Sequence, residues 1–208
     1  MTDLIVTSVA DGEATLTLNR PGAINSLNLE MLSKTTEILD SWAHDDSIRE
    51  VVLRGNGTRG FCAGADVREL SQAIQEGGPW LRFLETEYLL DMMVAQYPKH
   101  ITAHLHGITM GGGLGLTVGA DRRIVDSTSL LAMPETKIGF FPDAGVMRWL
   151  SRAGALGTHL TMTAGTIGGG DAMAIGLADE SADGDLPAPL SQASWIQECY
   201  VGDDAVEI

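Results

Sequence analysis

The stretch HGITMGGGLGLTVGAD, residues 106–121, places three consecutive glycines between a predicted strand and a predicted helix. The strand is predicted over Ile101–Leu105, which is rich in apolar and β-branched residues. Glycine lets ligand atoms approach the backbone, and the N–H groups at the start of a helix point towards negative charge. The stretch is therefore typical either of an oxyanion or anion site, or of a helix that packs tightly on a sheet.

A dinucleotide site is the other familiar use of such a run, and here the spacing argues against it. Counted from Gly111 or from Gly113, the third glycine of the fingerprint would fall on Leu116 or Val118. A phosphate-binding Gly-Lys-Ser/Thr motif is also missing from the sequence. Nucleotide phosphate binding at this loop is therefore not predicted.

Outward from the glycine run, strands alternate with helices, which predicts an α/β fold with a layered core. Asp11-Gly12 between two apolar runs is a good hairpin signal, and Asn28 is a good helix cap. We expect further strands over Leu4–Val9, Ala14–Leu18, Glu50–Arg54, Arg123–Val125 and Leu130–Met133, and helices over 28–43, from Val67 to the break at Gly77, Trp80–Gln96, Ala144–Arg152, Leu156–Thr163 and Asp171–Ile175.

A second loop, FCAGADVREL at residues 61–70, offers a turn of small residues before a helix. On its own it fits an ordinary helix start, with Asp66 as the cap. Together with the glycine run, and with NRPGAINSLN near Asn19, it resembles the crotonase (enoyl-CoA hydratase/isomerase) superfamily. The resemblance implies that backbone N–H groups of Ala65 and Gly112 form an oxyanion hole for the thioester carbonyl of an acyl-CoA.

The same resemblance implies the crotonase (ClpP-like) fold, with repeated ββα units, layered sheets and surrounding helices. It extends to GLAD, ending at Asp179, so we expect a crotonase-like core over residues 1–180. Residues 181–208 are expected to be an acidic connector and the start of an incomplete helical region, with one helix over Ala193–Tyr200. The sequence ends within an expected element, as a truncated relative would.

The carboxylates distinguish between reactions within this superfamily. Hydratases resembling this chain use two glutamates, and here the first position holds Gly115 while the second holds Glu135. Asp143 follows in MPETKIGFFPDAG, a combination that is similar to the 3-hydroxyisobutyryl-CoA hydrolase branch. That branch implies catalytic roles for Glu135 and Asp143, and substrate contacts for Glu87, Gly112, Glu135, Asp143 and Asp66.

Simpler roles for these residues stand beside the catalytic ones. Glu135 after Pro134 can be a helix-start residue, Asp143 a cap and Glu87 a solvated charge on a helix. If the resemblance holds, the expected reaction is hydrolysis of 3-hydroxyisobutyryl-CoA to 3-hydroxyisobutyrate and CoA, as in valine catabolism. The alternatives are hydratase or isomerase activity by Glu135 alone, and a non-catalytic scaffold that binds acyl-CoA.

Charge and composition exclude several classes of partner. The 208 residues carry a net charge of −15, which argues against nucleic acid and anionic membranes as partners. Residues 179–208 hold eight acidic and no basic residues, so the first 178 carry 20 acidic against 13 basic, a net of −7. The cations available for the phosphates of CoA are Arg20, Arg54, Arg59, Arg68 and Lys99.

The remaining expectations concern cofactors and location. Cys62 and Cys199 are too few for a disulfide framework and lack metal-site spacing, so both are expected to be reduced structural thiols. No metal or other cofactor is expected, and CoA enters only as part of the substrate. A cytoplasmic location is expected because no secretory signal opens the chain and no 18-residue apolar run could span a membrane. Self-association into a homo-oligomer is expected from the resemblance.

Overall fold

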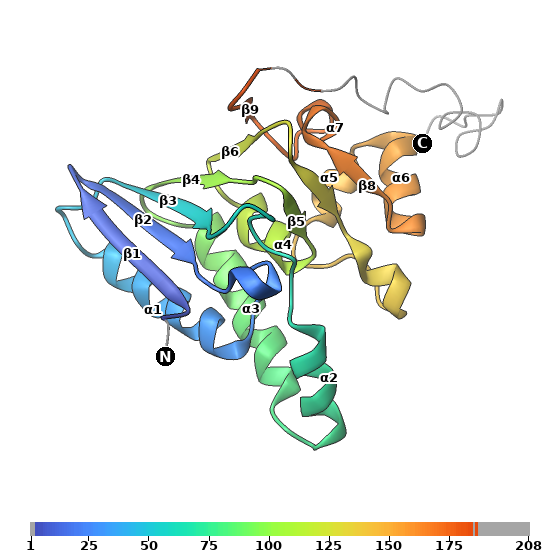
Figure 1. Cartoon of the computed structure of the whole chain (residues 1–208), viewed down its shortest axis with the longest axis horizontal. Coiled ribbons are helices and arrows are strands. Elements are labelled where there is room, and N and C mark those ends of the chain that lie inside the picture. The colour runs from blue at the N-terminus through green and yellow to red at the C-terminus, as the bar shows by residue number, and fades with distance from the viewer. Residues whose placement is uncertain (1–2, 185, 187–208) are drawn as a thin grey trace.

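The computed structural model describes residues 3–184 and 186, and it contains two β-sheets with helices packed around them (Figure 1). The larger sheet has six strands in the order β1-β2-β3-β4-β6-β9. Its β1 and β2 are antiparallel, and every other neighbouring pair is parallel. The strands are β1 (Ile5–Ala10), β2 (Glu13–Leu18), β3 (Glu50–Gly55), β4 (His100–His104), β6 (Arg122–Val125) and β9 (Glu180–Ser181).

The smaller sheet has three strands in the order β5-β7-β8. The first pair is parallel and the second is antiparallel. The strands are β5 (Ile108–Met110), β7 (Leu130–Ala132) and β8 (Thr166–Gly168). Since β5 directly precedes the glycine run, this sheet fixes where the run begins.

Helices surround both sheets, and α1 and α3 lie together on one side of the larger one (Figure 1). Helix α3 also packs against α4, the short helix that starts in the glycine run. The helices are α1 (Leu29–Ala43), α2 (Val67–Gln75), α3 (Trp80–Ala95), α4 (Gly112–Val118), α5 (Met147–Leu150), α6 (Gly154–Thr163) and α7 (Gly169–Ala174), with 3-10 turns η1 (Pro21–Ala23) and η2 (Pro134–Ile138).

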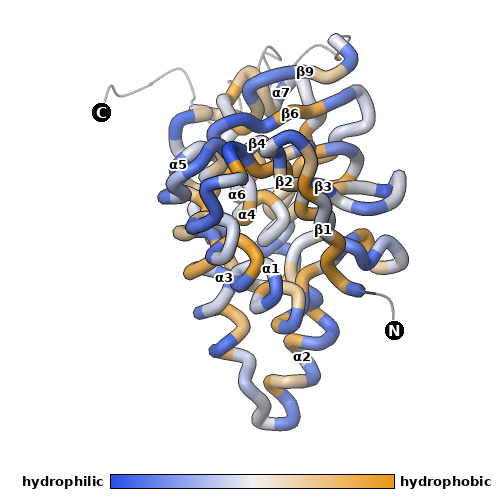
Figure 2. Tube along the Cα trace, turned by 90° about the vertical axis from the view of Figure 1, so that its left-hand side faces the viewer, coloured by the Kyte–Doolittle hydropathy of each residue, from blue (hydrophilic) through white to orange (hydrophobic). Residues whose placement is uncertain are grey.

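Local sequence signals explain the first elements. Asp11 and Gly12 both adopt positive φ, as the predicted hairpin turn requires. The Asn28 side chain accepts a hydrogen bond from the Met31 amide and so caps α1. In Figure 2, hydrophobic and hydrophilic residues alternate along α2, which buries no residue completely. The expected α/β fold is confirmed.

One predicted helix has the wrong bounds, and three short strands were not predicted. The helix expected over Ala144–Arg152 begins only at Met147, because Ala144 and Gly145 have φ of +49° and +76°, which no helix accommodates. The short strands β5, β8 and β9 were not predicted, since each is two or three residues long.

The helix expected over Ala193–Tyr200 and most of the expected connector lie outside the described residues. Within residues 3–184 and 186, no helix is long and apolar enough to cross a membrane.

Candidate active site

The two loops singled out in the sequence lie against each other, as a pair of short extended segments. The Cys62 amide donates to the Ile108 carbonyl, and the Met110 amide donates to the Cys62 carbonyl. Gly113 explains part of the glycine run, because a Cβ at this position would lie 2.5 Å from the Cys62 carbonyl oxygen. The packing interpretation of the run therefore holds here: glycine permits a close approach, and that approach brings the two loops together.

The predicted oxyanion amides lie at this junction. A Cβ built on Gly112 would be 3.7 Å from the Ala65 amide nitrogen, and one built on Gly64 would be 3.3 Å from the Gly112 amide nitrogen. Among the described residues, neither the Ala65 amide nor the Gly112 amide has an acceptor. Two neighbouring unsatisfied N–H groups can stabilise an oxyanion. The structure thus brings Ala65 and Gly112 together as expected.

Glu87 reaches this junction from α3 and is not a solvated charge. Its side chain is buried, and its Oε1 has no hydrogen-bond partner among residues 3–184 and 186. That oxygen lies 2.0 Å from where a Cβ on Gly112 would be, so only glycine leaves room for the carboxyl group. Burial, with smaller contributions from Asp143 and Glu135, raises the pKa of Glu87 to about 8.

Glu135 approaches the neighbouring glycine of the run, Gly111, from η2. It lies in η2, which starts at Pro134, and its side chain is buried. Its Oε1 is 2.8 Å from an ideal Cβ on Gly111, and its Oε2 is buried with no hydrogen-bond partner in the described part of the chain. Burial raises the pKa of Glu135 to about 7, with a smaller contribution from Asp143. A carboxyl group with this pKa is partly ionised at neutral pH and can act as a base or nucleophile.

Asp143 joins the cluster through a hydrogen bond from α3. The Tyr88 hydroxyl donates to Asp143 Oδ2 at 2.5 Å. Burial and this bond raise the pKa of Tyr88 above its ordinary value, so the phenol keeps its proton and remains the donor. Because Ala144 has positive φ and α5 begins only at Met147, Asp143 is not the cap of a helix that starts at Ala144.

Asp91 is a fourth carboxyl group in this region, and the sequence analysis missed it. It lies one helical turn beyond Glu87 on α3, and its Oδ2 is buried with no hydrogen-bond partner in the residues that the structure describes. Burial, and then Glu87 and Asp143, raise its pKa well above the ordinary value. The spacing of four between Glu87 and Asp91 was the available signal, since residues four apart share one face of a helix.

A cavity of about 680 Å³ opens beside these groups, between α3, α4 and the segment before α5. Tyr88, Asp91 and Asp143 contribute its polar lining, with Arg148. Its apolar lining includes Met92, Val118, Phe141, Pro142, Met147 and Trp149. An acyl group with a small number of polar substituents fits such a lining.

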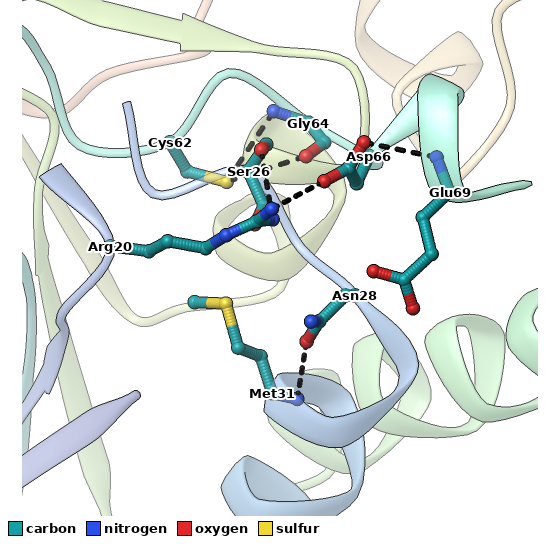
Figure 3. A network of polar contacts seen from close by, with 8 residues as sticks. All are labelled: Arg20, Ser26, Asn28, Met31, Cys62, Gly64, Asp66 and Glu69. Atoms are coloured by element: carbon teal, nitrogen blue, oxygen red, sulfur yellow. Dashed lines mark hydrogen bonds and ion pairs between the residues drawn. The ribbon is translucent and has the colours of Figure 1, made fainter. Parts of the chain in front are cut away.

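Asp66 has a structural role that the sequence also suggested. Its side chain accepts from the Glu69 amide, capping α2, and pairs with the Arg20 guanidinium at 2.7 Å (Figure 3). The same guanidinium donates to the Ser26 carbonyl at 3.1 Å. A substrate contact by Asp66 stays a prediction.

Three of the five cations expected near phosphates gather around a second hollow of about 680 Å³. Arg20, Arg59 and Arg68 line it, together with Ala65 of the oxyanion pair. The other two lie elsewhere: Arg54 contacts His104 at 3.3 Å, and the Lys99 ammonium donates to the Trp42 carbonyl at 2.5 Å. This cationic hollow, whose lining also includes Asp66 and Glu69, therefore reaches Ala65.

Cysteine and metal chemistry find no support in the described part of the chain. Cys62 is buried, its thiol donates to the Asn25 carbonyl, and burial raises its pKa to about 12. It is therefore the structural thiol that was expected, while Cys199 lies outside the described residues. No group of three or more His, Cys, Asp or Glu side chains between residues 3 and 184 is placed to hold a metal ion.

Because burial raises the pKa of Glu87 from 4.5 to about 8, the stability of the chain should fall as the pH rises. Between about pH 5 and 8 the folded chain keeps a proton on Glu87 that the unfolded chain has lost. We expect Glu87→Gln to remove this dependence and to raise the melting temperature at about pH 8 by about 3 °C or more. Thermal unfolding at both pH values checks this, with Glu85→Gln, an exposed residue of α3, as control. An equal pH dependence in wild type and Glu87→Gln would refute the assignment.

The chain matches a known protein family over nearly its whole length. The family model for enoyl-CoA hydratase/isomerase matches residues 14–207. The chain belongs to the enoyl-CoA hydratase/isomerase family. Among solved structures, it is similar to a carnitinyl-CoA dehydratase from Mycobacterium thermoresistibile, with a TM-score of 0.90 and 38% identity over 97% of this chain and 68% of the other. The expected crotonase fold is thereby confirmed.

Two curated relatives of this chain are named for different functions, one as a hydrolase and one as a ribosomal protein. The mitochondrial 3-hydroxyisobutyryl-CoA hydrolase of Xenopus tropicalis is 35% identical over 97% of this chain and 55% of its own length. The small ribosomal subunit protein mS47 of Neurospora crassa is 39% identical over 77% of this chain and 33% of its own length. The chain spans about half the length, or less, of the curated relatives it matches.

Proposed function

We propose that this chain hydrolyses a short 3-hydroxyacyl-CoA thioester, and specifically 3-hydroxyisobutyryl-CoA to 3-hydroxyisobutyrate and CoA. The observation that carries the proposal is the position of Glu135 beside Gly111, next to the Ala65 and Gly112 amides, with Asp143 near enough to raise the pKa of Glu135 and no space for a carboxylate at position 115. Similarity to 3-hydroxyisobutyryl-CoA hydrolases such as the Xenopus protein also supports it. The proposed partner is therefore an acyl-CoA substrate. A cytoplasmic location stays a prediction, and the Xenopus relative is named as mitochondrial. Self-association also stays a prediction.

In the proposed reaction, the thioester carbonyl oxygen accepts hydrogen bonds from the Ala65 and Gly112 amides. These donors stabilise the negative charge that develops on that oxygen, and the loss of one such donor typically costs about 10²–10³ in rate. The carboxylate of Glu135 either attacks the carbonyl carbon or removes a proton from a water that attacks it. In the first route the CoA thiolate leaves from the tetrahedral adduct, which leaves a mixed anhydride between the acyl group and Glu135. Water then hydrolyses this anhydride, releasing the acid and regenerating the Glu135 carboxylate.

Hydration with two glutamates is disfavoured by the packing around Gly115. A Cβ at this position would lie 2.4 Å from the Cβ of Ala144 and 2.9 Å from Asp91 Oδ2. A glutamate there would require the segment containing Ala144 to move. Hydratase or isomerase activity by Glu135 alone is the second candidate, supported by the family match and the dehydratase-like structure. A non-catalytic scaffold is the third, and the ribosomal relative supports it.

The cationic hollow is the proposed site for the phosphate-bearing arm of CoA. Arg68 has no side-chain partner among the described residues, so its charge is available to a phosphate. We expect Arg68→Glu to weaken CoA binding about tenfold, because an attractive contact becomes a repulsive one. Titration calorimetry with CoA checks this, and Arg54→Glu, outside the hollow, is the matched control. A similar loss of affinity in both variants would mean that only the overall charge matters.

The experiment that tests the proposal compares two reactions of the same protein. The wild-type chain is incubated with 3-hydroxyisobutyryl-CoA while free CoA thiol is measured, and in parallel with crotonyl-CoA while hydration is measured. Thiol release that exceeds hydration supports the hydrolase. Hydration without thiol release supports the second candidate, and tight binding of both esters with neither reaction supports the scaffold.

A further inference from the structure

The buried carboxyl group of Asp91 has no role in the reaction proposed above. Its Oδ2 is buried, makes no hydrogen bond within the described residues, and belongs to a side chain that lines the 680 Å³ cavity. A buried polar oxygen without a partner destabilises the fold, which a protein rarely accepts without a function. The group is therefore a candidate for contact with a ligand in that cavity.

The packing of α3 against α4 determines how far Asp91 lies from the oxyanion pair. Glu87 faces Gly112 of the oxyanion pair, and Asp91, one turn later, faces Gly115. Asp91 Oδ2 is 2.9 Å from where a Cβ on Gly115 would be, so glycine is what allows the carboxyl group to approach α4. The Asp91 carboxyl is thus displaced from the oxyanion site by about one helical turn, about 5.4 Å.

The rest of the cavity offers few polar partners. Asp143 Oδ2 already accepts from the Tyr88 hydroxyl, whereas Asp91 Oδ2 accepts from nothing in the described chain. Most of the remaining lining is apolar, from side chains such as Met92 and Val118. An acyl group held in this cavity would satisfy Asp91 only if it carried a hydrogen-bonding group of its own.

We infer that Asp91 binds the hydroxyl group of a 3-hydroxyacyl-CoA and so selects hydroxylated acyl groups over unsubstituted ones. The inference rests on the proposed function, because it concerns the same substrate class. In such a substrate the hydroxyl oxygen is separated from the carbonyl carbon by three bonds, about 4 Å. With a hydrogen bond of about 2.8 Å, this reach covers the helical turn between the oxyanion site and Asp91.

The electrostatics of the cavity suit a neutral hydroxyl. Asp91 faces the carboxyl groups of Glu87 and Asp143, with Tyr88 and Arg148 in the same lining. Burial and the two neighbouring carboxyl groups raise the pKa of Asp91 well above its usual range. A protonated carboxyl group donates one hydrogen bond and accepts others, which matches a hydroxyl group that does the same. Asp143 remains available to the reacting water or the leaving group.

Binding of two unreactive thioethers tests the inference without any need for turnover. The probes are S-(3-hydroxy-2-methylpropyl)-CoA and S-(2-methylpropyl)-CoA, which differ only in the hydroxyl group. We expect wild type to bind the hydroxylated probe about tenfold or more tightly, and Asp91→Leu to lose that preference while binding the other probe at least as well. Asp91→Asn keeps a donor and an acceptor and should retain part of the preference.

Matched variants separate the possible outcomes. Met92→Leu, in the same lining, and Asp143→Asn should both keep the preference for the hydroxylated probe. The inference is overturned if wild type shows no preference, or if folded Asp91→Leu keeps it. Thermal unfolding verifies that each variant is folded, and Asp91→Ala replaces Asp91→Leu if the latter is not. If wild type releases no thiol from 3-hydroxyisobutyryl-CoA but the preference depends on Asp91, the proposed hydrolysis fails and this inference stands.

Discussion

Replacing Glu135 with glutamine should lower kcat for thiol release from 3-hydroxyisobutyryl-CoA by about 10³-fold or more. Glutamine keeps the shape and burial of the side chain but is neither a nucleophile nor a base. General-base catalysis alone contributes about 10²–10⁴ to a rate, and a nucleophilic route through Glu135 would lose more. The change corresponds to about 4 kcal/mol of transition-state stabilisation. Steady-state release of free thiol measures it.

Binding separates this loss from a structural one. Glu135→Gln should bind S-(3-hydroxy-2-methylpropyl)-CoA within about threefold of wild type, because the oxyanion amides and the cavity are unchanged. Glu85→Gln, on the exposed side of α3, should leave kcat unaltered. A Glu135→Gln protein that binds the thioether normally and retains most of its activity would remove Glu135 from the mechanism.

Replacing Asp143 with asparagine should lower kcat by about 10²-fold, and lower it more than it lowers binding of the thioether. Asparagine can still accept from the Tyr88 hydroxyl, whose bond to Asp143 is 2.5 Å long, so the position of the side chain is kept. What is lost is a negative charge and a proton acceptor beside Glu135. The measurement is kcat for thiol release beside a calorimetric Kd for the thioether.

Equal losses in kcat and in thioether affinity would change the role given to Asp143. They would mean that Asp143 holds the substrate in the ground state as much as in the transition state. The division of roles between Asp143 and Asp91 would then be contradicted as well. Tyr88→Phe offers a milder test, since it removes the donor to Asp143 and leaves both carboxyl groups in place.

Sequence signals predicted the elements whose causes are local. Asp11-Gly12 specifies the hairpin turn, and Asn28 caps α1, because both depend on residues only a few positions apart. The start of α5 was misjudged, because the positive φ values at Ala144 and Gly145 are not encoded in local propensity. The three short strands depend on partners distant in sequence and carry little pattern of their own.

The motifs of the candidate site could be read from the sequence, but its full set of residues could not. The two loops, Glu135 and Asp143 follow from motif order, and the structure brings them together. Asp91 escaped notice because its importance depends on α3 packing against Gly115, which the sequence alone does not specify. Similarly, five cations were available for phosphate, but only the fold determines that Arg20, Arg59 and Arg68 share one hollow.

The most direct measurement is the release of free thiol from 3-hydroxyisobutyryl-CoA at about pH 6 and about pH 8, beside the hydration of crotonyl-CoA. With the pKa of Glu135 raised to about 7, the carboxylate form that the mechanism requires becomes about tenfold more abundant across this range. The account predicts kcat/KM for thiol release that rises about tenfold with pH, with little hydration. Hydration of crotonyl-CoA without thiol release at either pH would contradict it.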